Sequence, residues 1–580
     1  MSQTPNAASL LGGVFLAPAR DAAVEVRRSL AGQLDPMLWR TVEIPGRGIV
    51  ALNTNAAACP LPDPQCGFAA CRENTSSGLA ARIASAYRTH GPRFPAAFDE
   101  TFSAIVYDRA ADRVVLACDT FASGGMWYFY DREILYFGDH CAALMGAFGQ
   151  PRFPCPRSID SYFVLGQVLP PDTGYRGIHR LPLNSALIVE GTRATVQQAT
   201  WKPRPSQPDS SAAAVELIHS ALEEECARIG PPDSRIGLLF SGGLDSTLLA
   251  ALLRKRYPRL KAHLLSDGSG DPAARAGAGA LGIPLECITL DDPAELHPVH
   301  AVTRTGMPVF SFAESYISRF LAHVEPDADQ FVIGCGADTV FLSTEQMANA
   351  VSVMEKVAPG RRASYQKSLD LPRVLKGHKR AVRGLLYTPE FRRSLEGAAP
   401  LTLLIRMFLD FADDGDAAAL MMQYLTMNHS RNVALYAQNL HPPKTVDWPY
   451  LAKSFLNAVL GVAQYEGRPC DPGKTILRSI VARYIDTPAD GYPKRGFGEL
   501  LSLSEWFTPE RVASSRVEVL ESGICQAGIL REEMVKSIYD VCSTPDRPPP
   551  LLNLAWSILS LAVWYERSFT LPSRNAMPSL

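Results

Sequence analysis

The sequence predicts a chain of two parts: a β-rich α+β half over residues 1–205 and an α/β half over 212–580 whose C-terminal part is largely helical. Three observations support this division. Short β-prone runs broken by Asp, Gly and Arg fill the first half, and a Pro/Ser-rich linker follows at 202–213. Beyond the linker, apolar strands alternate with helical segments, which is typical of a parallel sheet with crossover helices.

The predicted strands of the two halves differ in their surroundings. In the first half each run is short and bounded by turn residues, whereas in the second half each strand leads into a helical pattern. From about residue 345 the pattern is nearly all helical. The strands predicted in the first half are 104–107, 113–117, 127–130 and 134–137, and those in the second half are 236–240, 261–266, 284–289 and 330–334.

Composition narrows the class of protein. The chain has 580 residues, enough for two to four domains, with 20% charged and 47% hydrophobic residues, and its formal net charge of −2 gives no support for a nucleic-acid partner. The 12 cysteines include no Cys-x-x-Cys pair, so we expect scattered reduced thiols. No basic segment precedes the first apolar run, and the apolar stretch 551–565 is too short to span a bilayer. We therefore expect a cytoplasmic protein without a membrane span, in which 551–565 is a buried helix.

One glycine-rich loop carries most of the functional information. Residues 241–246 read Ser-Gly-Gly-Leu-Asp-Ser and stand between the apolar strand 236–240 and a helix. Unpaired N–H groups and the dipole at a helix start favour a phosphate there, and the two glycines let the backbone approach it closely. The hydroxyls of Ser241 and Ser246 add donors, and Asp245 can bind Mg²⁺. A glycine turn that only packs a helix on a strand is the alternative, and no Gly-Lys-Ser/Thr of a Walker A loop follows.

Two later segments complete the expected site. Strand 330–334 runs into a glycine turn, and Asp338 lies just beyond it. Because the carboxyl ends of parallel strands line one crevice, Asp245 and Asp338 are expected to share Mg²⁺ and hold the triphosphate of ATP. Lys494, on the Gly-flanked loop 492–498, supplies a point charge for phosphate, although a surface lysine is the usual meaning of such a signal.

Taken together, these segments resemble known families. The loop 241–246 is similar to the PP-loop of ATP pyrophosphatases, and the whole set resembles the class B asparagine synthetases. The resemblance implies a degenerate glutaminase domain of the Ntn-hydrolase type, then a PP-loop domain of the adenine nucleotide alpha hydrolase type. Further segments that look like the family's are 117–119, 136–139, 175–182, 474–478, 552–556 and 564–567.

The resemblance also implies a reaction and its residues. A carboxylate attacks ATP to give an acyl-adenylate and pyrophosphate, and an amine then forms the amide and releases AMP. Pyrophosphate is expected on Ser241, Gly242, Gly243 and Ser246, and Mg²⁺ on Asp245 and Asp338. Leu239, Leu265 and Gly334 are expected to line the adenosine pocket, and Lys494 to stabilise charge as pyrophosphate leaves.

Two departures from the family pattern bear on the substrate. The family's glutaminase nucleophile is a Cys directly after Met, but Ser2 stands here, the equivalent strand 10–15 has no Cys, and no Asn-Gly-Glu loop is visible. We therefore expect no ammonia from glutamine. Second, Cys335 stands where asparagine synthetases keep Glu and β-lactam synthetases keep Tyr, which favours another substrate. We expect Cys335 to be buried and inert rather than a catalytic thiol.

These departures favour the lasso peptide cyclase branch, of the capistruin type. Such a macrolactam synthetase adenylates an Asp or Glu side chain of a leader-free precursor peptide, and the peptide's N-terminal amine closes the ring. The expected partners are the precursor peptide, a leader peptidase and a leader-binding protein. A β-lactam or other small-molecule amide synthetase is the alternative. Less favoured are a glutamine- or ammonia-dependent asparagine synthetase, a PP-loop tRNA-modifying enzyme and a non-catalytic scaffold.

Overall fold

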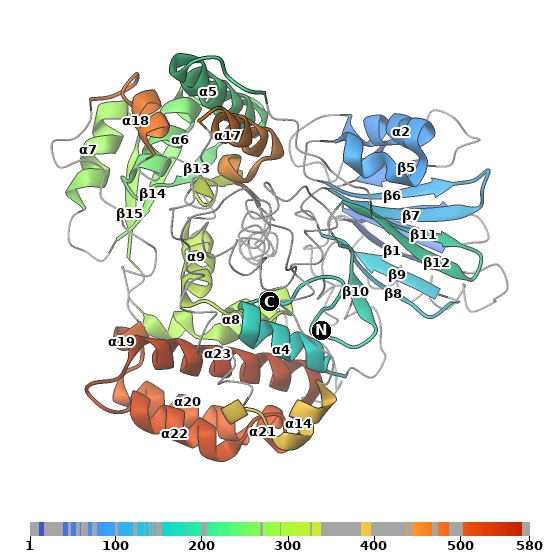
Figure 1. Ribbon diagram of the computed structural model, residues 1–580, viewed down its shortest axis with the longest axis vertical. Coiled ribbons are helices and arrows are strands. Elements are labelled where there is room, and N and C mark those ends of the chain that lie inside the picture. The colour runs from blue at the N-terminus through green and yellow to red at the C-terminus, as the bar shows by residue number, and fades with distance from the viewer. Residues whose placement is uncertain are drawn as a thin grey trace.

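Three groups of elements make up the structure. The computed structural model places one pair of β-sheets, a separate parallel sheet covered by helices, and a layer of C-terminal helices below the parallel sheet in the view of Figure 1. It describes residues 11–16, 39–44, 48–53, 58–59, 68–71, 78–98, 102–119, 125–132, 134–138, 141, 144, 153–182, 184–198, 206–266, 271–289, 292–324, 328–337, 384–395, 437, 444–466, 474–486 and 503–570.

Within the described residues of the N-terminal half, the strands form two antiparallel sheets of six strands each. The first has the order β10-β8-β9-β1-β3-β2, with β1 Leu11–Leu16, β2 Trp39–Ile44, β3 Gly48–Asn53, β8 Trp127–Tyr130, β9 Ile134–Gly138 and β10 Ile178–Arg180. The second has the order β12-β11-β7-β6-β5-β4, with β4 Ala58–Cys59, β5 Phe68–Cys71, β6 Ser103–Asp108, β7 Arg113–Cys118, β11 Ser185–Glu190 and β12 Arg193–Gln198. The four strands predicted here from the sequence are confirmed, as β6 to β9.

The alternate directions of the side chains along β7 show how these two sheets are stacked. Val114 and Leu116 share a buried core with Leu135 of β9 in the other sheet. Val115 and Ala117 point to the opposite face, where they pack against α2 (Leu79–His90) and the 3₁₀ helix η1 (Gly91–Ala97). Successive side chains of a strand point to opposite faces, so the second sheet lies between its partner sheet and the helix α2. The α+β sandwich expected for this half is therefore present, with α2 over one side (Figure 1).

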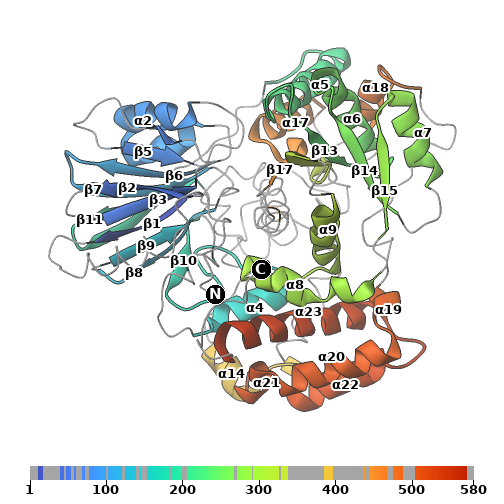
Figure 2. The ribbon, with the colours of Figure 1, turned by 180° about the vertical axis from the view of Figure 1, so that it is seen from behind.

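The segment between the sandwich strands reaches the C-terminal helices. Helix α4 (Pro156–Leu165) lies beside α23 in both ribbon views (Figures 1 and 2). The hydroxyl of Tyr162 lies 3.0 Å from the carbonyl oxygens of both Val309 and Ser557. In another contact between the halves, buried Lys453 donates from Nζ to the carbonyl of Phe98 at 2.8 Å. The two halves are thus joined by buried polar contacts as well as by the linker.

A five-stranded parallel sheet is the framework of the second half. Its order is β15-β14-β13-β16-β17, with β13 Ile236–Leu239, β14 Lys261–Leu265, β15 Leu285–Ile288, β16 Gln330–Ile333 and β17 Thr445–Asp447. The four strands predicted from the sequence are confirmed. The edge strand β17 was not predicted, because three residues between prolines leave no readable alternation.

Helices cover both faces of this sheet. Leu238, Leu264 and Val332 belong to one buried core with α5 (Ser211–Arg228), α6 (Leu244–Arg256), α17 (Lys453–Glu466) and α18 (Thr475–Val481). Leu239, Leu265 and Ile333 belong to another core with α9 (Phe312–His323) and the C-terminal helices. Burial on both faces explains why these strands are continuous apolar runs rather than alternating ones.

Helix α5 begins inside the predicted linker. The side chain of Ser210 accepts a hydrogen bond from the N–H of Ala213 at 3.2 Å and so caps the helix. The predicted linker 202–213 therefore extends three residues too far, because a serine N-cap satisfies an N–H of the first turn and lets the helix begin at Ser211. The other helices between these strands are α7 Pro272–Leu281, η2 Pro293–Leu296 and α8 Pro298–Thr305, and η4 Pro449–Leu451 follows β17.

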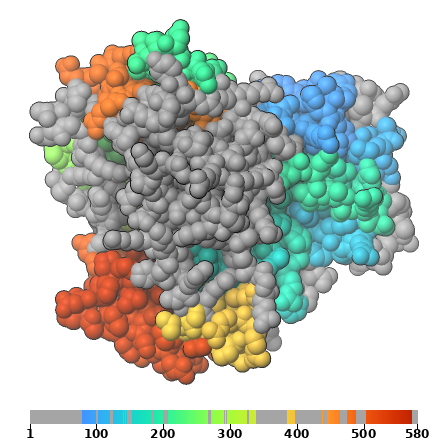
Figure 3. Space-filling model, viewed as in Figure 1, coloured from blue at the N-terminus to red at the C-terminus, as the bar shows by residue number. Residues whose placement is uncertain are grey.

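The C-terminal layer is organised around α23 (Pro549–Tyr565), which is buried along most of its length. The prediction of a buried helix over 551–565 is confirmed, and the helix begins two residues earlier. In the space-filling view the atoms of α14 adjoin those of the C-terminal helices along the lower edge (Figure 3). The remaining elements are α14 Pro389–Ser394, α19 Leu503–Trp506, α20 Pro509–Glu521, α21 Gly523–Gln526, α22 Glu532–Cys542 and the π-helical η6 Glu566–Thr570.

Candidate nucleotide site

The loop between β13 and α6 has the geometry that its sequence predicts. The N–H of Phe240 donates to the carbonyl of His263 at 2.9 Å, which continues the pairing of β13 with β14 for one more residue. Gly242 then turns the chain with φ +74°, and Gly243 is the N-cap of α6. As a glycine, this N-cap residue has no side chain with which to cap the helix start. Its first N–H groups are therefore oriented for an acceptor such as a phosphate oxygen.

The two serines of the loop are bonded to each other. The Oγ atoms of Ser241 and Ser246 lie 3.2 Å apart. Ser241 Oγ accepts from the N–H of Gly243 at 3.3 Å, while Ser246 Oγ donates to the Gly243 carbonyl at 3.1 Å. These contacts fix the shape of the loop in advance and place two rotatable hydroxyl donors beside the helix start.

Gly242 stands where a side chain has no space. A Cβ atom at this position would lie 2.7 Å from both the backbone N and the Cα of Ala274, in the first turn of α7. Because the obstructing atoms are backbone, no side-chain rotation relieves the contact. The positive φ adds a second requirement for glycine.

The turn after β16 approaches the same helix start. A Cβ on Gly334 would lie 3.6 Å from the backbone N of Ser246, so the two loops are in contact. Gly336 has φ +106°, and its Cβ would lie 2.4 Å from Leu451 Cδ2. Cys335 between them is half-buried. Cys335 is therefore less buried than expected, because the turn carries it past the end of the strand, although it still packs against the core.

Asp245 forms an ion pair beside the loop. Its Oδ2 lies 2.6 Å from Nζ of Lys474, and the two side chains are 23% and 14% exposed. The hydroxyl of buried Tyr450 donates to the backbone carbonyl of Asp245 at 2.9 Å. Burial, and after it the charge of Asp245, raise the pKa of Tyr450 well above its usual value, so this hydroxyl stays a donor. Asp245 therefore lies between an ammonium group and a fixed backbone contact.

The contact of Lys474 with Asp245 was not predicted from the sequence. We placed Lys474 only in a segment resembling the family's and gave it no partner. It directly precedes α18 and has φ +50°. The pair joins positions 229 residues apart, so no local pattern indicates it. The only signal available was a lone lysine at a helix start, where a cation is unfavourable and needs a nearby anion.

The other predicted residues divide into two groups. Leu239 and Leu265, expected near adenosine, end adjacent strands and are buried. Just beyond Leu265, the hydroxyl of Ser266 donates to the carboxylate of Asp271 at 2.6 Å. Asp338 and Lys494 lie outside the described residues.

The donor set at Asp245 suits magnesium. Within the described ranges no group of three or more His, Cys, Asp or Glu side chains could hold a metal ion. Mg²⁺ does not need such a cage, since it commonly takes one or two carboxylates, substrate phosphates and water. Asp245, next to hydroxyl and N–H donors for the phosphates, fits this mode of binding.

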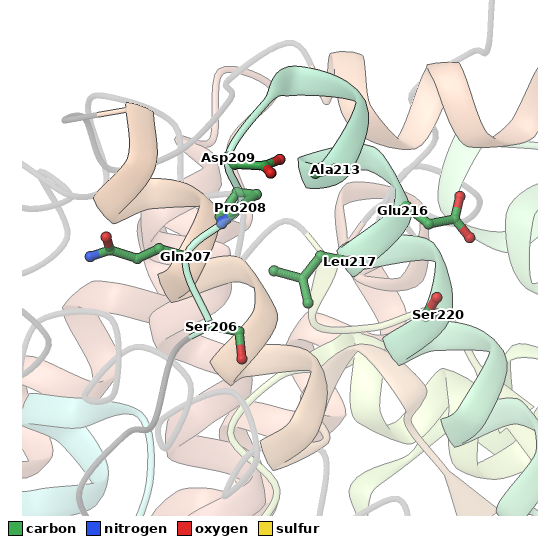
Figure 4. Close-up of a pocket in the computed structure, with 8 residues that line it drawn as sticks. All are labelled: Ser206, Gln207, Pro208, Asp209, Ala213, Glu216, Leu217 and Ser220. Atoms are coloured by element: carbon green, nitrogen blue, oxygen red, sulfur yellow. The ribbon is translucent and has the colours of Figure 1, made fainter.

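A separate pocket of about 560 Å³ lies elsewhere. The linker lines one side and the first turns of α5 line the other (Figure 4). Its lining residues are Ser206, Gln207, Pro208, Asp209, Ala213, Glu216, Leu217 and Ser220. None of them belongs to the loop 241–246, so this pocket is separate from the candidate nucleotide site.

Comparison with known proteins identifies the family. The family model described as Asparagine synthase matches residues 218–566, which is more than half of the chain. The protein belongs to this family. The match begins within α5 and includes the loop 241–246, the turn 334–336 and α18. The family expected from the sequence is thereby confirmed, whereas the branch within it is not tested.

Individual relatives are similar over a short stretch. Proteins of Mycobacterium bovis and Mycobacterium tuberculosis named "Putative asparagine synthetase (glutamine-hydrolyzing)" are 35% identical over 109 residues. This stretch is 18% of the chain and 17% of each relative. Among solved structures, this chain matches the glutamine phosphoribosylpyrophosphate amidotransferase from B. subtilis complexed with ADP and GMP. The match covers 57% of this chain and 76% of the amidotransferase chain. It is 10% identical with a TM-score of 0.18, which supports no argument.

No helix in the described part of the chain is both long and apolar enough to cross a membrane.

Proposed function

We propose that this protein is an ATP-dependent amide synthetase that works through an acyl-adenylate. A carboxylate oxygen attacks the α-phosphorus of ATP, and pyrophosphate leaves with the electrons of the broken P–O bond. An amine then attacks the acyl carbon and loses a proton, and AMP leaves. The observation that carries this proposal is the uncapped strand–loop–helix at 241–246 in a member of the Asparagine synthase family.

The described residues supply specific parts of this chemistry. The Ser241 and Ser246 hydroxyls, with the N–H groups at the start of α6, bind the phosphates that leave as pyrophosphate. Asp245 holds Mg²⁺, which supplies charge neutralisation to the triphosphate when it is bound. Asp338 as a second ligand and Lys494 as a stabilising charge belong to this proposal on the resemblance alone. Lys474, 2.6 Å from Asp245, lies within reach of the same phosphates.

For the substrate, we propose a peptide that is closed on itself. In a lasso peptide cyclase, an Asp or Glu side chain of a leader-free precursor is adenylated and the peptide's N-terminal amine closes a macrolactam. The strand β1, expected to correspond to the family's nucleophile-bearing strand, reads Leu-Gly-Gly-Val-Phe-Leu and holds no cysteine. This supports an amine that does not come from glutamine. A tethered amine also has a high effective concentration and needs no second substrate.

Half-buried Cys335 is the second support for this substrate. A thiol at this position offers neither the carboxylate of an asparagine synthetase nor the phenol of a β-lactam synthetase. The leader peptidase and leader-binding protein that such a pathway requires are proposed partners.

Three synthetic peptides test the proposal. The first has a free N-terminal amine and an internal Asp or Glu, the second is the same peptide N-acetylated, and the third carries Asn or Gln in place of the acid. With ATP and Mg²⁺, the first should lose one water and release AMP. The acetylated peptide should support exchange of labelled pyrophosphate into ATP without ring closure, and the third should support neither. Closure of a small β-amino acid, with none of the peptides processed, would instead indicate a β-lactam synthetase.

A further inference from the structure

One polar contact at each end of the segment 474–484, which contains α18, links it to α6. We call these two contacts the anchors of α18. At the start of α18, Lys474 pairs with Asp245 at 2.6 Å. Past its end, the hydroxyl of Tyr484 accepts a hydrogen bond from Nζ of Lys255 at 3.0 Å. Lys474 and Tyr484 are ten positions apart, and so are Asp245 and Lys255. Both stretches are largely helical, and ten helical residues extend about 15 Å, so the two helices lie parallel with matched anchors.

The second anchor joins three helices rather than two. The Tyr484 hydroxyl also lies 2.7 Å from Nε2 of His219, a buried residue of α5. Nζ of Lys255 lies 4.7 Å from the centre of the Tyr484 ring, and it also donates to Glu223 of α5 at 3.3 Å. One hydroxyl therefore connects the end of the α18 segment to both α5 and α6.

The apolar face of α18 cannot set its axial position so sharply. Its buried side chains Ile476, Leu477, Ile480 and Val481 pack in the core shared with α5 and α6. Apolar contact is non-directional, whereas hydrogen bonds weaken steeply when their geometry changes. The two end contacts, with the ion pair of Arg483 and Glu216 of α5 at 2.9 Å, therefore add directional restraints on where α18 stands along α6. Since Lys474 directly precedes the helix, any shift of α18 moves its ammonium group relative to Asp245.

We propose that Tyr484 is a positioning residue, which through α18 holds Lys474 at the correct distance from the phosphate-binding loop. The inference rests on the proposed function of that loop. Lys474 balances the charge of Asp245 in the structure described here. With Mg²⁺ and ATP bound, Asp245 would hold the metal ion, which would supply charge neutralisation, and the Lys474 ammonium group would face the phosphates. Tyr484 contributes to nucleotide binding without touching the nucleotide.

The test is a double-mutant cycle on the full chain, with the dissociation constant of MgATP measured by calorimetry. Tyr484→Phe keeps the ring over Lys255 but removes the hydroxyl contacts. A lost hydrogen bond of ordinary strength predicts about three- to tenfold weaker MgATP binding in the native background. In the Lys474→Met background, Tyr484→Phe should change the dissociation constant by less than about twofold, because the residue it positions is gone.

Two further variants sharpen the test. Lys255→Met breaks the same anchor from α6 at an exposed side chain and should repeat the pattern. Tyr87→Phe removes a hydroxyl bonded to Asp108 at 2.9 Å in the sandwich and should leave MgATP binding unchanged. Equal weakening by Tyr484→Phe with and without Lys474, or none in either, would overturn the positioning role. Absence of MgATP binding by the unaltered protein would instead overturn the proposed function of the loop, and the inference with it.

Discussion

Replacement of Gly242 by alanine tests whether the proposed phosphate-binding loop 241–246 needs its backbone geometry. The residue has φ +74°, and a Cβ atom would lie 2.7 Å from two backbone atoms of Ala274. Real Cβ atoms essentially never approach a heavy atom within 3.0 Å, so either the loop or the first turn of α7 must move. Both segments border the proposed site, so we expect an effect on nucleotide binding as well as on stability.

The loss of folding stability expected for Gly242→Ala has two parts. A Cβ in the left-handed region costs about 1–2 kcal/mol. Forcing an extra methyl group into a packed contact costs about 1–3 kcal/mol more. The sum, about 2–5 kcal/mol, is a large share of the stability of an ordinary domain. A loop that moves to avoid the contact changes the positions of the Ser241 and Gly243 N–H groups, so phosphate binding is lost even if the fold survives.

The assay combines urea unfolding with calorimetric titration of MgATP. The matched control is Gly279→Ala, which makes the same chemical change on the exposed side of α7, where a Cβ would meet nothing within 4 Å. We expect that control to bind MgATP normally and to be about 0.5–1 kcal/mol more stable, because alanine is the better helix former. Gly242→Ala with native affinity and with stability within 0.5 kcal/mol of the unaltered protein would refute the reasoning.

Three further outcomes are expected. Asp245→Asn should abolish exchange of labelled pyrophosphate into ATP, because it removes a metal ligand; its melting temperature is the control, and exchange within tenfold of native would contradict the assignment. Turnover of labelled ATP should give AMP and pyrophosphate, and ADP as the main product would exclude the proposed reaction. Burial, and after it the negative charge of Asp119, raise the pKa of the Cys118 thiol to about 12. The thiol therefore ionises more readily in the unfolded chain, and the contribution of Cys118 to stability should fall as the pH rises above the ordinary pKa of a thiol. Unfolding midpoints of Cys118→Ala and native protein between pH 8 and 10 measure this, and parallel curves would count against it.

Local signals predicted much of the α/β half. Each strand from β13 to β16 is an apolar run that leads into a helical pattern, and the patterns of strand and helix are each recognisable within a few residues. The loop 241–246 was readable for the same reason, because its glycines, serines and helix start are consecutive in sequence. The buried helix α23 followed from its uninterrupted apolar stretch. The edge strand β17 was missed because its short segment forms a strand only through pairing with β16.

The sequence by itself determined the family, the strand–loop–helix around the glycine-rich loop 241–246 and the alternation of strands and helices, since these depend on neighbouring residues. Only the tertiary structure decided which distant groups meet. The pairing of Asp245 with Lys474, the three-helix contact at Tyr484 and the packing of α4 on α23 each join residues far apart in the chain. Their proximity follows from the path of the whole chain and the packing of its helices, so a local sequence pattern does not indicate it.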